Sequence, residues 1–547
     1  MCPSLAPYCI WDLKSLMKKN KYILLCLIVV LAFVLRFYKL GEVPLGFHQD
    51  EVSQAYNSFS ILTTARDRYG QLLPVLFRSF GSYQPPVYTY LTPIPIFLFG
   101  NTIFAARSTS ALFGVLIVVI TYLIVETLVK QKYRYNLALL SAFVAAISPW
   151  SIHFSRRVVE GNLGLFFFLL ALYFSLLSLK KIKYFLLACL VLGISTHAYY
   201  SERLISVIFL PVFLIYFRTY YLKYKKWVVY GLLVFGLTLI PHVITIATGA
   251  FFARFNQVGS GGNGSFFLEF GKHFISYFSP KYLFSDAGSG LARVSPNLGV
   301  FYDWFFLPFL AGLYFLSKII DKKIIKFLGI FMVISLIPVS LTGDVFYPLR
   351  ALEFFWLLSL VISIGLLGIG EMIKHKRIKW PAFLMLVIYS LGSFYVSYFI
   401  LFQHETTENM GNTYIELSRE LDKYDGYNVI LDSTRDSAAG LRIAYFRSYN
   451  PGKLQTLLRS QLTTPYYSNQ VNGQELYVVD NIEARPINWK EDRCSAKTIL
   501  AGDSLAFSGE QIEQHHLRKL FEIKGVNNDV VLRGYETNPD EKCKLKL

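Results

Sequence analysis

Long apolar blocks are the feature that most restricts what this chain can fold into. Eleven of them follow one another with almost no charge inside, and most have about the length that a helix needs to cross a hydrocarbon core of about 30 Å. Only 16% of all residues are charged, whereas a soluble domain carries about 25%. This pattern excludes a soluble multidomain protein. The blocks are residues 22–38, 107–129, 136–152, 162–179, 184–198, 203–217, 227–250, 300–317, 324–341, 350–370 and 380–402.

A twelfth apolar stretch, from Pro85 to Phe99, is shorter and contains four prolines. Proline removes a backbone donor and interrupts a helix, so a regular spanning helix is not expected here. We interpret this stretch as an interfacial or re-entrant segment. The first block is not followed by a small-residue cleavage site, so we interpret it as a retained anchor and not as a signal peptide.

The links between the blocks predict the orientation of the chain in a plasma (inner) membrane. With eleven spans, basic and non-basic links alternate without exception, so every lysine- and arginine-rich link falls on the same side, and basic links face the cytoplasm. The net charge of +18 is therefore orientation charge and does not indicate a nucleic-acid partner. We expect a cytoplasmic N-terminus and an extracytoplasmic C-terminal region. The basic links lie near residues 14–21, 130–134, 180–183, 218–226, 318–326 and 374–379.

The predicted fold is an α-helical polytopic membrane protein with an extracytoplasmic α/β domain. A cytoplasmic N-terminus (residues 1–20) precedes a transmembrane domain (21–402), and a soluble domain (403–547) follows it. The transmembrane domain carries a first outer loop (39–106) and a Gly/Ser-rich outer loop (251–299). In the soluble domain a helical pattern over residues 414–421 precedes strand-like runs at 428–431, 475–479 and 529–532.

Candidate chemical groups accumulate at the outer ends of the helices, whereas the inner links hold little besides lysine and arginine. Ionisable groups beside hydrocarbon are costly and usually need a partner or a water-filled cavity. Any one of them could be a solvated helix end, but their one-sided accumulation favours function on the outer face. The acidic members are Asp50, Glu51, Glu160, Glu202, Asp303, Asp344 and Glu353, and the basic ones include Arg107, Arg156, Arg157, Arg203 and Arg350.

The sharpest local pattern is the run Gly46-Phe47-His48-Gln49-Asp50-Glu51, just after the first block. It is followed by an amphipathic run from Val52 to Arg66. Two adjacent carboxylates can have different pKa values, so that one acts as a base while the other orients it. Such a pair is common by itself, and it becomes more specific together with Gln84-Pro85-Pro86 at the entry of the proline-containing stretch.

Together these segments resemble the bacterial protein O-mannosyltransferase family (glycosyltransferase family 39, dolichyl-phosphate-mannose-protein mannosyltransferases). That family belongs to the GT-C superfamily, which also contains the aminoarabinose lipid A transferases. The resemblance runs over most of residues 20–400. Its carriers are Asp50-Glu51, Gln84-Pro85-Pro86-Val87-Tyr88, Gly100 with Arg107, the run from Ser148 to Arg156, the run from Tyr277 to Phe284, and Pro338 to Thr342 with Arg350.

The resemblance implies a GT-C fold and an inverting transfer of a sugar from a polyprenyl-phosphate carrier to an acceptor hydroxyl. In such enzymes the aspartate of the first outer loop acts on the acceptor, a role that falls here on Asp50 with Glu51 as its partner. The leaving lipid phosphate needs cationic stabilisation. The expected substrate- and phosphate-binding residues are Arg156, Arg157, Arg350, Gln84 and Arg203, although each arginine could instead be an interfacial anchor.

Two departures from the family leave the sugar open, as mannose or another hexose or pentose. Related enzymes often have Lys or His where this chain has Gln84, and the aminoarabinose transferases carry an Arg where this chain has Ser53 and Gln54. The acceptor stays open as well, as a protein, a lipid or a glycan. The expected partners are the lipid bilayer, the lipid-linked donor and this acceptor.

The cysteines have no metal-ligand spacing, so the sequence requires no divalent metal, while Cys494 and Cys543 could form a disulfide in an oxidising compartment. The alternative function is a polytopic transporter or lipid flippase. Transport predicts polar residues at mid-membrane in paired halves, and the chain offers mainly Pro241-His242 without an internal repeat.

Overall fold

The computed structural model describes the chain except for residues 1–5, 130–131, 260–264, 289–293, 407–409 and 544–547. Contacts within the chain divide it into two compact units. Unit 1 comprises Met1–Tyr38, Ser110–Leu239 and Ser260–Tyr395, and unit 2 comprises Lys39–Thr109, Ile240–Gly259 and Val396–Leu547. The first outer loop, which we expected with the transmembrane domain, thus groups with the C-terminal region.

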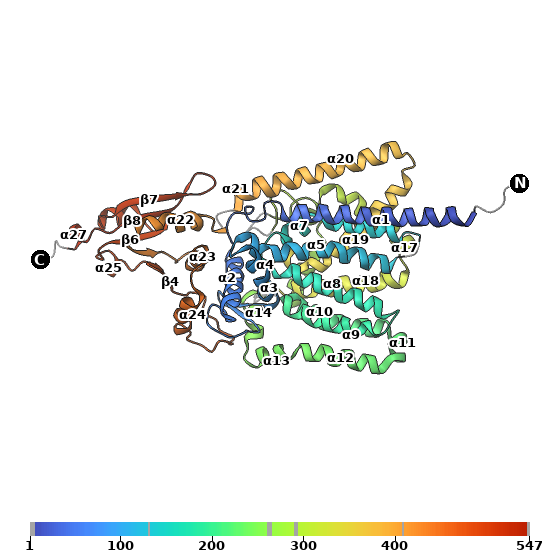
Figure 1. Ribbon diagram of the computed structural model, residues 1–547, viewed down its shortest axis with the longest axis horizontal. Coiled ribbons are helices and arrows are strands. Elements are labelled where there is room, and N and C mark those ends of the chain that lie inside the picture. The colour runs from blue at the N-terminus through green and yellow to red at the C-terminus, as the bar shows by residue number, and fades with distance from the viewer. Residues whose placement is uncertain (1–5, 130–131, 260–264, 289–293, 407–409, 544–547) are drawn as a thin grey trace. The chain divides into compact units, whose positions relative to one another are not determined.

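Unit 1 is helical, and a helix covers each apolar block that falls in it (Figure 1). The blocks contain few helix breakers, and apolar side chains on all faces are typical of helices buried in protein or lipid. The helices are α1 (Ala6–Phe37), α5 (Ile103–Leu128, which begins in unit 2), α6 (Arg134–Ile147), α7 (Pro149–Ser155), α8 (Glu160–Ser178), α9 (Tyr184–Ala198), α10 (Tyr200–Tyr216), α11 (Arg218–Tyr221), α12 (Lys225–Thr238), α15 (Phe266–Ser276), α16 (Pro280–Phe284), α17 (Phe306–Ile319), α18 (Lys322–Ser340), α19 (Leu352–Met372) and α20 (Lys376–Phe394).

The chain is a multi-pass membrane protein, although the number of spans stays a prediction. By length and composition, five of the described helical segments can cross a bilayer, and two bent pairs would raise that number to seven. One bent pair is α6 with α7, which meet at 56° where Pro149 begins a new helix. Three shorter apolar helices, among them Tyr22–Phe37 and Tyr184–Ala198, lie below the length limit.

Close helix approach in unit 1 depends on small residues. Helices α17 and α19 pack against each other, and a Cβ added at Gly365 would lie 1.7 Å from the carbonyl oxygen of Pro308. A Cβ at Gly312 would lie 2.0 Å from the carbonyl oxygen of Val361. Small residues at such crossings let helix backbones meet, which is how helices commonly pack in membranes.

The first outer loop of unit 2 folds into helices and a short hairpin. Helix α2 (Gln49–Thr64) covers the amphipathic run and packs on α3 (Pro86–Leu91) and α4 (Pro93–Phe99). The two prolines Pro86 and Pro93 each stand at a helix start, so the proline-containing stretch is two short helices and not one regular helix. Strands β1 (Phe77–Ser79) and β2 (Ser82–Gln84) pair antiparallel. Unit 2 also contains α13 (Ile240–Ala247) and α14 (Ala253–Val258).

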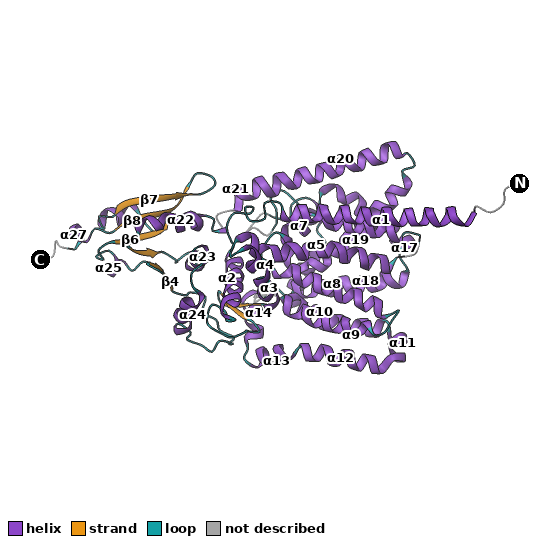
Figure 2. Cartoon of the chain, in the orientation of Figure 1, coloured by secondary structure: helices purple, strands orange, loops and turns teal. Residues whose placement is uncertain are grey.

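The C-terminal part of unit 2 is an α/β fold around a six-stranded sheet of order β4-β5-β3-β6-β8-β7 (Figure 2). Strand β3 (Asn428–Leu431) runs parallel to β5 (Ile482–Ala484) and β6 (Thr498–Asp503), whereas β4 (Tyr477–Val479), β7 (Arg518–Lys524) and β8 (Val530–Glu536) pair antiparallel. The continuous apolar run of β3 explains its central position, because inner parallel strands are covered on both faces. The helices are α21 (Phe402–Thr406), α22 (Thr413–Leu421), α23 (Ala439–Phe446), α24 (Pro451–Ser460), α25 (Trp489–Asp492), α26 (Gly509–Gln514) and α27 (Pro539–Lys542).

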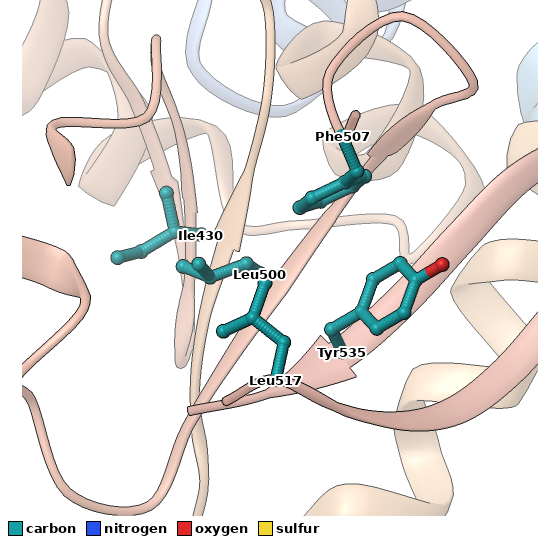
Figure 3. Packing of buried hydrophobic residues seen from close by; sticks show 5 residues of the cluster. All are labelled: Ile430, Leu500, Phe507, Leu517 and Tyr535. Carbon is teal, nitrogen blue, oxygen red and sulfur yellow. The ribbon is translucent and has the colours of Figure 1, made fainter. Parts of the chain in front are cut away.

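The predicted α/β character of the C-terminal region is confirmed. The helical pattern corresponds to α22 and the strand-like runs to β3, β4 and β8. One face of the sheet buries Ile430, Leu500 and Tyr535 against Phe507 and Leu517 (Figure 3). A disulfide joins Cys494 and Cys543, whose Cα atoms are 6.0 Å apart. Residues 260–264 of the Gly/Ser-rich loop lie outside the described residues.

Candidate functional site

The start of helix α2 holds the carboxylate pair in two different environments. His48 is the N-cap, and its backbone N–H donates to Glu51 Oε2 at 3.0 Å, while its ring nitrogen Nδ1 accepts from the backbone N–H of Asp50 at 3.4 Å. This reciprocal arrangement is a capping box, which satisfies backbone donors that the helix itself cannot use. The chain reaches it through Gly46, whose φ of +75° is the left-handed conformation that glycine tolerates best.

Glu51 is buried and pairs with Arg107, one of the residues on which the family resemblance rests. Its Oε1 lies 3.7 Å from Arg107 Nε, and the two side chains are 2% and 0% exposed. Arg107 also donates to the carbonyl oxygens of Pro44 and Gly46, both at 2.6 Å, and of Leu40 at 3.3 Å. One guanidinium therefore fixes both the incoming loop and the first turn of α2.

Asp50 differs from Glu51 in that its side chain is only half-buried. Within the described part of the chain, no hydrogen bond or ion pair engages its carboxylate. Its position is set through its backbone, because Gln84 Nε2 donates to the Asp50 carbonyl oxygen at 3.0 Å. A partly accessible carboxylate on a fixed backbone can accept a proton from a ligand.

Gln84, expected to bind substrate, uses both ends of its amide inside unit 2. Its Oε1 accepts from the Ser53 hydroxyl at 2.9 Å while Nε2 donates to Asp50, and the residue is 4% exposed. The structure thus brings Asp50, Glu51 and Gln84 together around the start of α2. That Glu51 and Gln84 touch substrate stays a prediction, and their geometry favours a supporting role.

The four candidate arginines belong to unit 1 and differ in their surroundings. Arg156 is fully buried at the end of α7 and donates to the carbonyl oxygens of Leu35 and Arg36 at 3.0 and 3.1 Å. The next residue, Arg157, is half-buried. Arg156 therefore ties α7 to the end of α1, which is a structural task.

The other two arginines lie beside aromatic rings. Arg350 Nη1 donates to Asp344 Oδ2 at 3.0 Å, and its guanidinium lies 4.1 Å from the ring centroid of Tyr347. Arg203, 8% exposed, lies 4.3 Å from the ring centroid of Tyr200. Both are cation–π contacts. Arg350 and Arg157 are the more accessible pair.

Two of the remaining acidic candidates of unit 1, Glu202 and Glu353, lie against each other. Asp303 accepts from the Tyr389 hydroxyl at 2.9 Å, and Glu202 and Glu353 are both buried. Among the described residues, no group of three or more His, Cys, Asp or Glu side chains could hold a metal ion.

The sequence analysis did not single out two buried arginines, Arg36 and Arg68. Arg36 is fully buried in α1 and donates to the carbonyl oxygens of Ala145 and Ala146 and to Ser151 Oγ. A single arginine inside an apolar block is a signal that could have found it. Arg68 contacts Glu475 across a separation that no sequence pattern reports.

Comparisons with known proteins agree with this architecture. Residues 83–244 match the family model described as "Dolichyl-phosphate-mannose-protein mannosyltransferase". No curated protein matches the chain in sequence. The solved structure of ArnT from Cupriavidus metallidurans bound to undecaprenyl phosphate is similar at a TM-score of 0.60 and 12% identity, covering 93% of this chain and 97% of that one. The same protein in its apo state gives a TM-score of 0.57 at 11% identity, with the same coverage.

The similarity to ArnT over nearly the whole of both chains shows the GT-C fold, which the resemblance over most of residues 20–400 implies. The matched family model begins at β2, includes Gln84, Arg107, Arg156 and Arg203, and ends in α13. The expectation of a glycosyltransferase is confirmed, and the transporter alternative has no support. The chain has the GT-C fold, and its residues 83–244 match a mannosyltransferase family model, which together support a membrane glycosyltransferase.

Proposed function

We propose that this protein transfers a sugar from a polyprenyl-phosphate carrier to an acceptor hydroxyl on the outer face of the membrane, with Asp50 as the general base. The observation that carries the proposal is the state of the carboxylate pair. The Glu51 carboxylate accepts the capping hydrogen bond and pairs with Arg107. Asp50 presents a half-buried carboxylate, and Gln84 holds its backbone.

An alcohol is a poor nucleophile near neutral pH, so the acceptor needs a positioned base. Asp50 removes the hydroxyl proton as the acceptor oxygen attacks the anomeric carbon. The bond from that carbon to the carrier phosphate breaks, and the configuration inverts. Glu51 does not take part in the proton transfer and instead keeps the helix start in place.

The departing group is an anionic lipid phosphate, which needs cations and hydrogen-bond donors and no proton. ArnT from Cupriavidus metallidurans, which shares the fold, binds undecaprenyl phosphate. We assign the phosphate contacts here to Arg157 and Arg350 first. A guanidinium has five N–H donors, so Arg350 retains donors beyond its bond to Asp344. Arg156 is the weaker candidate, because backbone carbonyls already occupy it.

The proposed orientation has the N-terminus in the cytoplasm and unit 2 outside. The alternating basic links support it. The disulfide between Cys494 and Cys543 supports it as well, since disulfides persist in oxidising compartments. The mannosyltransferase family model makes mannose the first sugar to test and a protein hydroxyl the first acceptor.

The test is donor turnover by the purified protein in lipid, with a panel of polyprenyl-phosphate sugars and free polyprenyl phosphate as the readout. Acceptor-dependent release of the carrier phosphate from at least one donor supports the proposal. Movement of the intact donor across the bilayer without release would contradict it and would indicate a flippase.

A further inference from the structure

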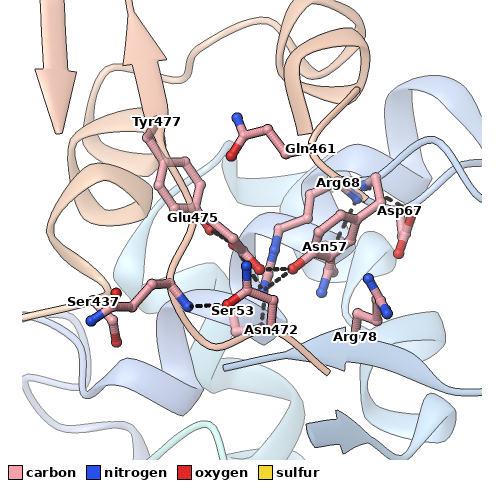
Figure 4. A network of polar contacts seen from close by, with 12 residues as sticks. Ser53, Asn57, Asp67, Arg68, Arg78, Ser437, Gln461, Asn472, Glu475 and Tyr477 are labelled. Carbon is pink, nitrogen blue, oxygen red and sulfur yellow. Dashed lines mark hydrogen bonds and ion pairs between the residues drawn. The ribbon is translucent and has the colours of Figure 1, made fainter. Parts of the chain in front are cut away.

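A buried arginine of the first outer loop lies between the helix that carries Asp50 and the C-terminal α/β fold. Arg68 has no exposed surface, and Figure 4 shows it among Ser53, Asn57 and Glu475, all residues of unit 2. Its Nη1 donates to Ser53 Oγ at 2.6 Å, and its backbone N–H donates to Asn57 Oδ1 at 3.1 Å. Arg68 is thus fixed to two successive turns of α2.

Glu475, just before β4, supplies the negative partner. Its Oε2 lies 4.0 Å from Arg68 Nη2, and its side chain is 8% exposed. The hydroxyls of Tyr69 and Tyr477 both donate to this carboxylate. Burial raises the pKa of both tyrosines, so the phenols stay protonated and remain donors. Arg68 Nη2 completes the group by donating to the Tyr69 hydroxyl at 3.3 Å.

Hydrogen bonds continue from Arg68 to Asp50 in one fixed direction. A guanidinium can only donate, so the Ser53 oxygen accepts from Arg68 and must give its own proton to Gln84 Oε1 at 2.9 Å. The amide of Gln84 is then oriented with Nε2 toward the Asp50 carbonyl oxygen at 3.0 Å. Without the charge on Arg68, the hydroxyl could rotate and the amide could turn over, which would remove the donor from Asp50.

We propose that Glu475 is a positioning residue for the base. The Glu475 carboxylate holds Arg68 in place, and Arg68 fixes the direction of the Ser53 and Gln84 hydrogen bonds. These bonds in turn fix the backbone of Asp50. This inference rests on the proposed function, in which Asp50 accepts the proton of the acceptor. It gives the C-terminal α/β fold an indirect part in catalysis, through the position of Asp50.

The test compares Glu475→Gln with Asp492→Asn in the full-length protein. Asp492 is a matched control, because its 4%-exposed carboxylate also pairs with an arginine of the same fold, Arg485, at 2.8 Å and accepts from the backbone N–H of Asn488 at 2.7 Å. We expect Glu475→Gln to lower kcat by about 10- to 100-fold, since small misplacements remote from the chemistry can cost that much, with KM for the donor unchanged. Asp492→Asn should leave kcat unchanged.

Two further variants separate positioning from general damage. Ser53→Ala interrupts the same hydrogen bonds at their middle, so combining it with Glu475→Gln should lower kcat no further than one change alone, because residues in one network are not additive. Glu475→Gln should likewise have no effect on the residual rate of Asp50→Asn. Glu475→Asp, which keeps the charge, should restore part of kcat.

The inference is overturned if Glu475→Gln keeps the kcat of the wild type, if Asp492→Asn reproduces its loss, or if the loss remains at full size on top of Asp50→Asn. Should Glu475→Gln fail to fold, wild-type kcat in Ser53→Ala would overturn the inference by itself. Failure of the proposed function looks different, because then the wild-type protein releases no carrier phosphate from any donor.

Discussion

Replacing Glu51 by glutamine tests the separation between the structural and the chemical carboxylate. Glutamine can still accept from the His48 backbone N–H, since a capping box takes either residue. It loses the charge that faces Arg107 at 3.7 Å in a site where both side chains are almost fully buried. Removing one partner of a buried pair typically costs about 3–5 kcal/mol.

The lower end of that range applies here, because Arg107 keeps its three bonds to backbone carbonyls. We therefore expect a loss of about 3 kcal/mol in the free energy of unfolding of unit 2. For a unit of this size that loss corresponds to a lowering of Tm by about 6–12 °C. Glu51→Ala should lower Tm further, because it also removes the capping bond, which is worth about 0.5–2 kcal/mol.

The assay is thermal unfolding of the purified protein in detergent, followed at the same time by donor turnover below the transition. Glu51→Gln should have a lower Tm than the wild type and an unchanged kcat. If Glu51 were the catalytic carboxylate, the same change would lower kcat and leave Tm unchanged. An unchanged Tm together with lost turnover would refute the structural role that we assign to Glu51.

Three other measurements test separate parts of the structure. Burial raises the pKa of Asp67 to about 6 from its ordinary 3.8, so the folded protein binds this proton more tightly than the unfolded chain does. The free energy of unfolding of the wild type should therefore rise relative to that of Asp67→Asn as pH falls from 6 to 4, and parallel curves of stability against pH would contradict this. Cys494→Ser removes the disulfide, which closes a separation of 49 residues, and should cost about 4 kcal/mol on the chain-entropy estimate, seen as a lower Tm; titration of the unfolded, unreduced wild type should find four thiols among the six cysteines, and six thiols would show that the bond is absent. An impermeant thiol reagent added outside intact cells should label Thr434→Cys and not Lys322→Cys, both exposed positions, in a background without Cys2, Cys9, Cys26 and Cys189, and external labelling at 322 would reverse the topology.

The helices of unit 1 could be predicted from the sequence because membrane burial imposes one simple rule, a long apolar run. Each predicted block is helical, and Pro149 and Pro93 begin new helices as proline chemistry requires. The amphipathic run from Val52 to Arg66 also corresponds to a helix, α2, whereas its start at Gln49 with His48 as the N-cap is seen only in the structure.

The roles within the site could not be predicted to the same depth. Asp50 and Glu51 are neighbours in sequence with the same chemistry, and only the position of Arg107 shows that one is buried and paired. From the sequence alone, Gln84 could be a substrate ligand or a residue that stabilises the loop. The structure shows that its amide is hydrogen-bonded to Ser53 and Asp50. Arg68 and Glu475 are 407 positions apart, with no local pattern that relates them.

The measurement that tests the central claim most directly is turnover of a polyprenyl-phosphate sugar by Asp50→Asn. This change keeps the shape of the side chain and removes its basicity, and loss of a general base typically lowers kcat by about 10²- to 10⁴-fold. Glu42→Gln is the matched control, because Glu42 is an exposed carboxylate of the same loop. The account predicts a loss of that size in Asp50→Asn with donor binding retained and with Glu42→Gln unaffected. Turnover by Asp50→Asn at the wild-type rate would contradict it.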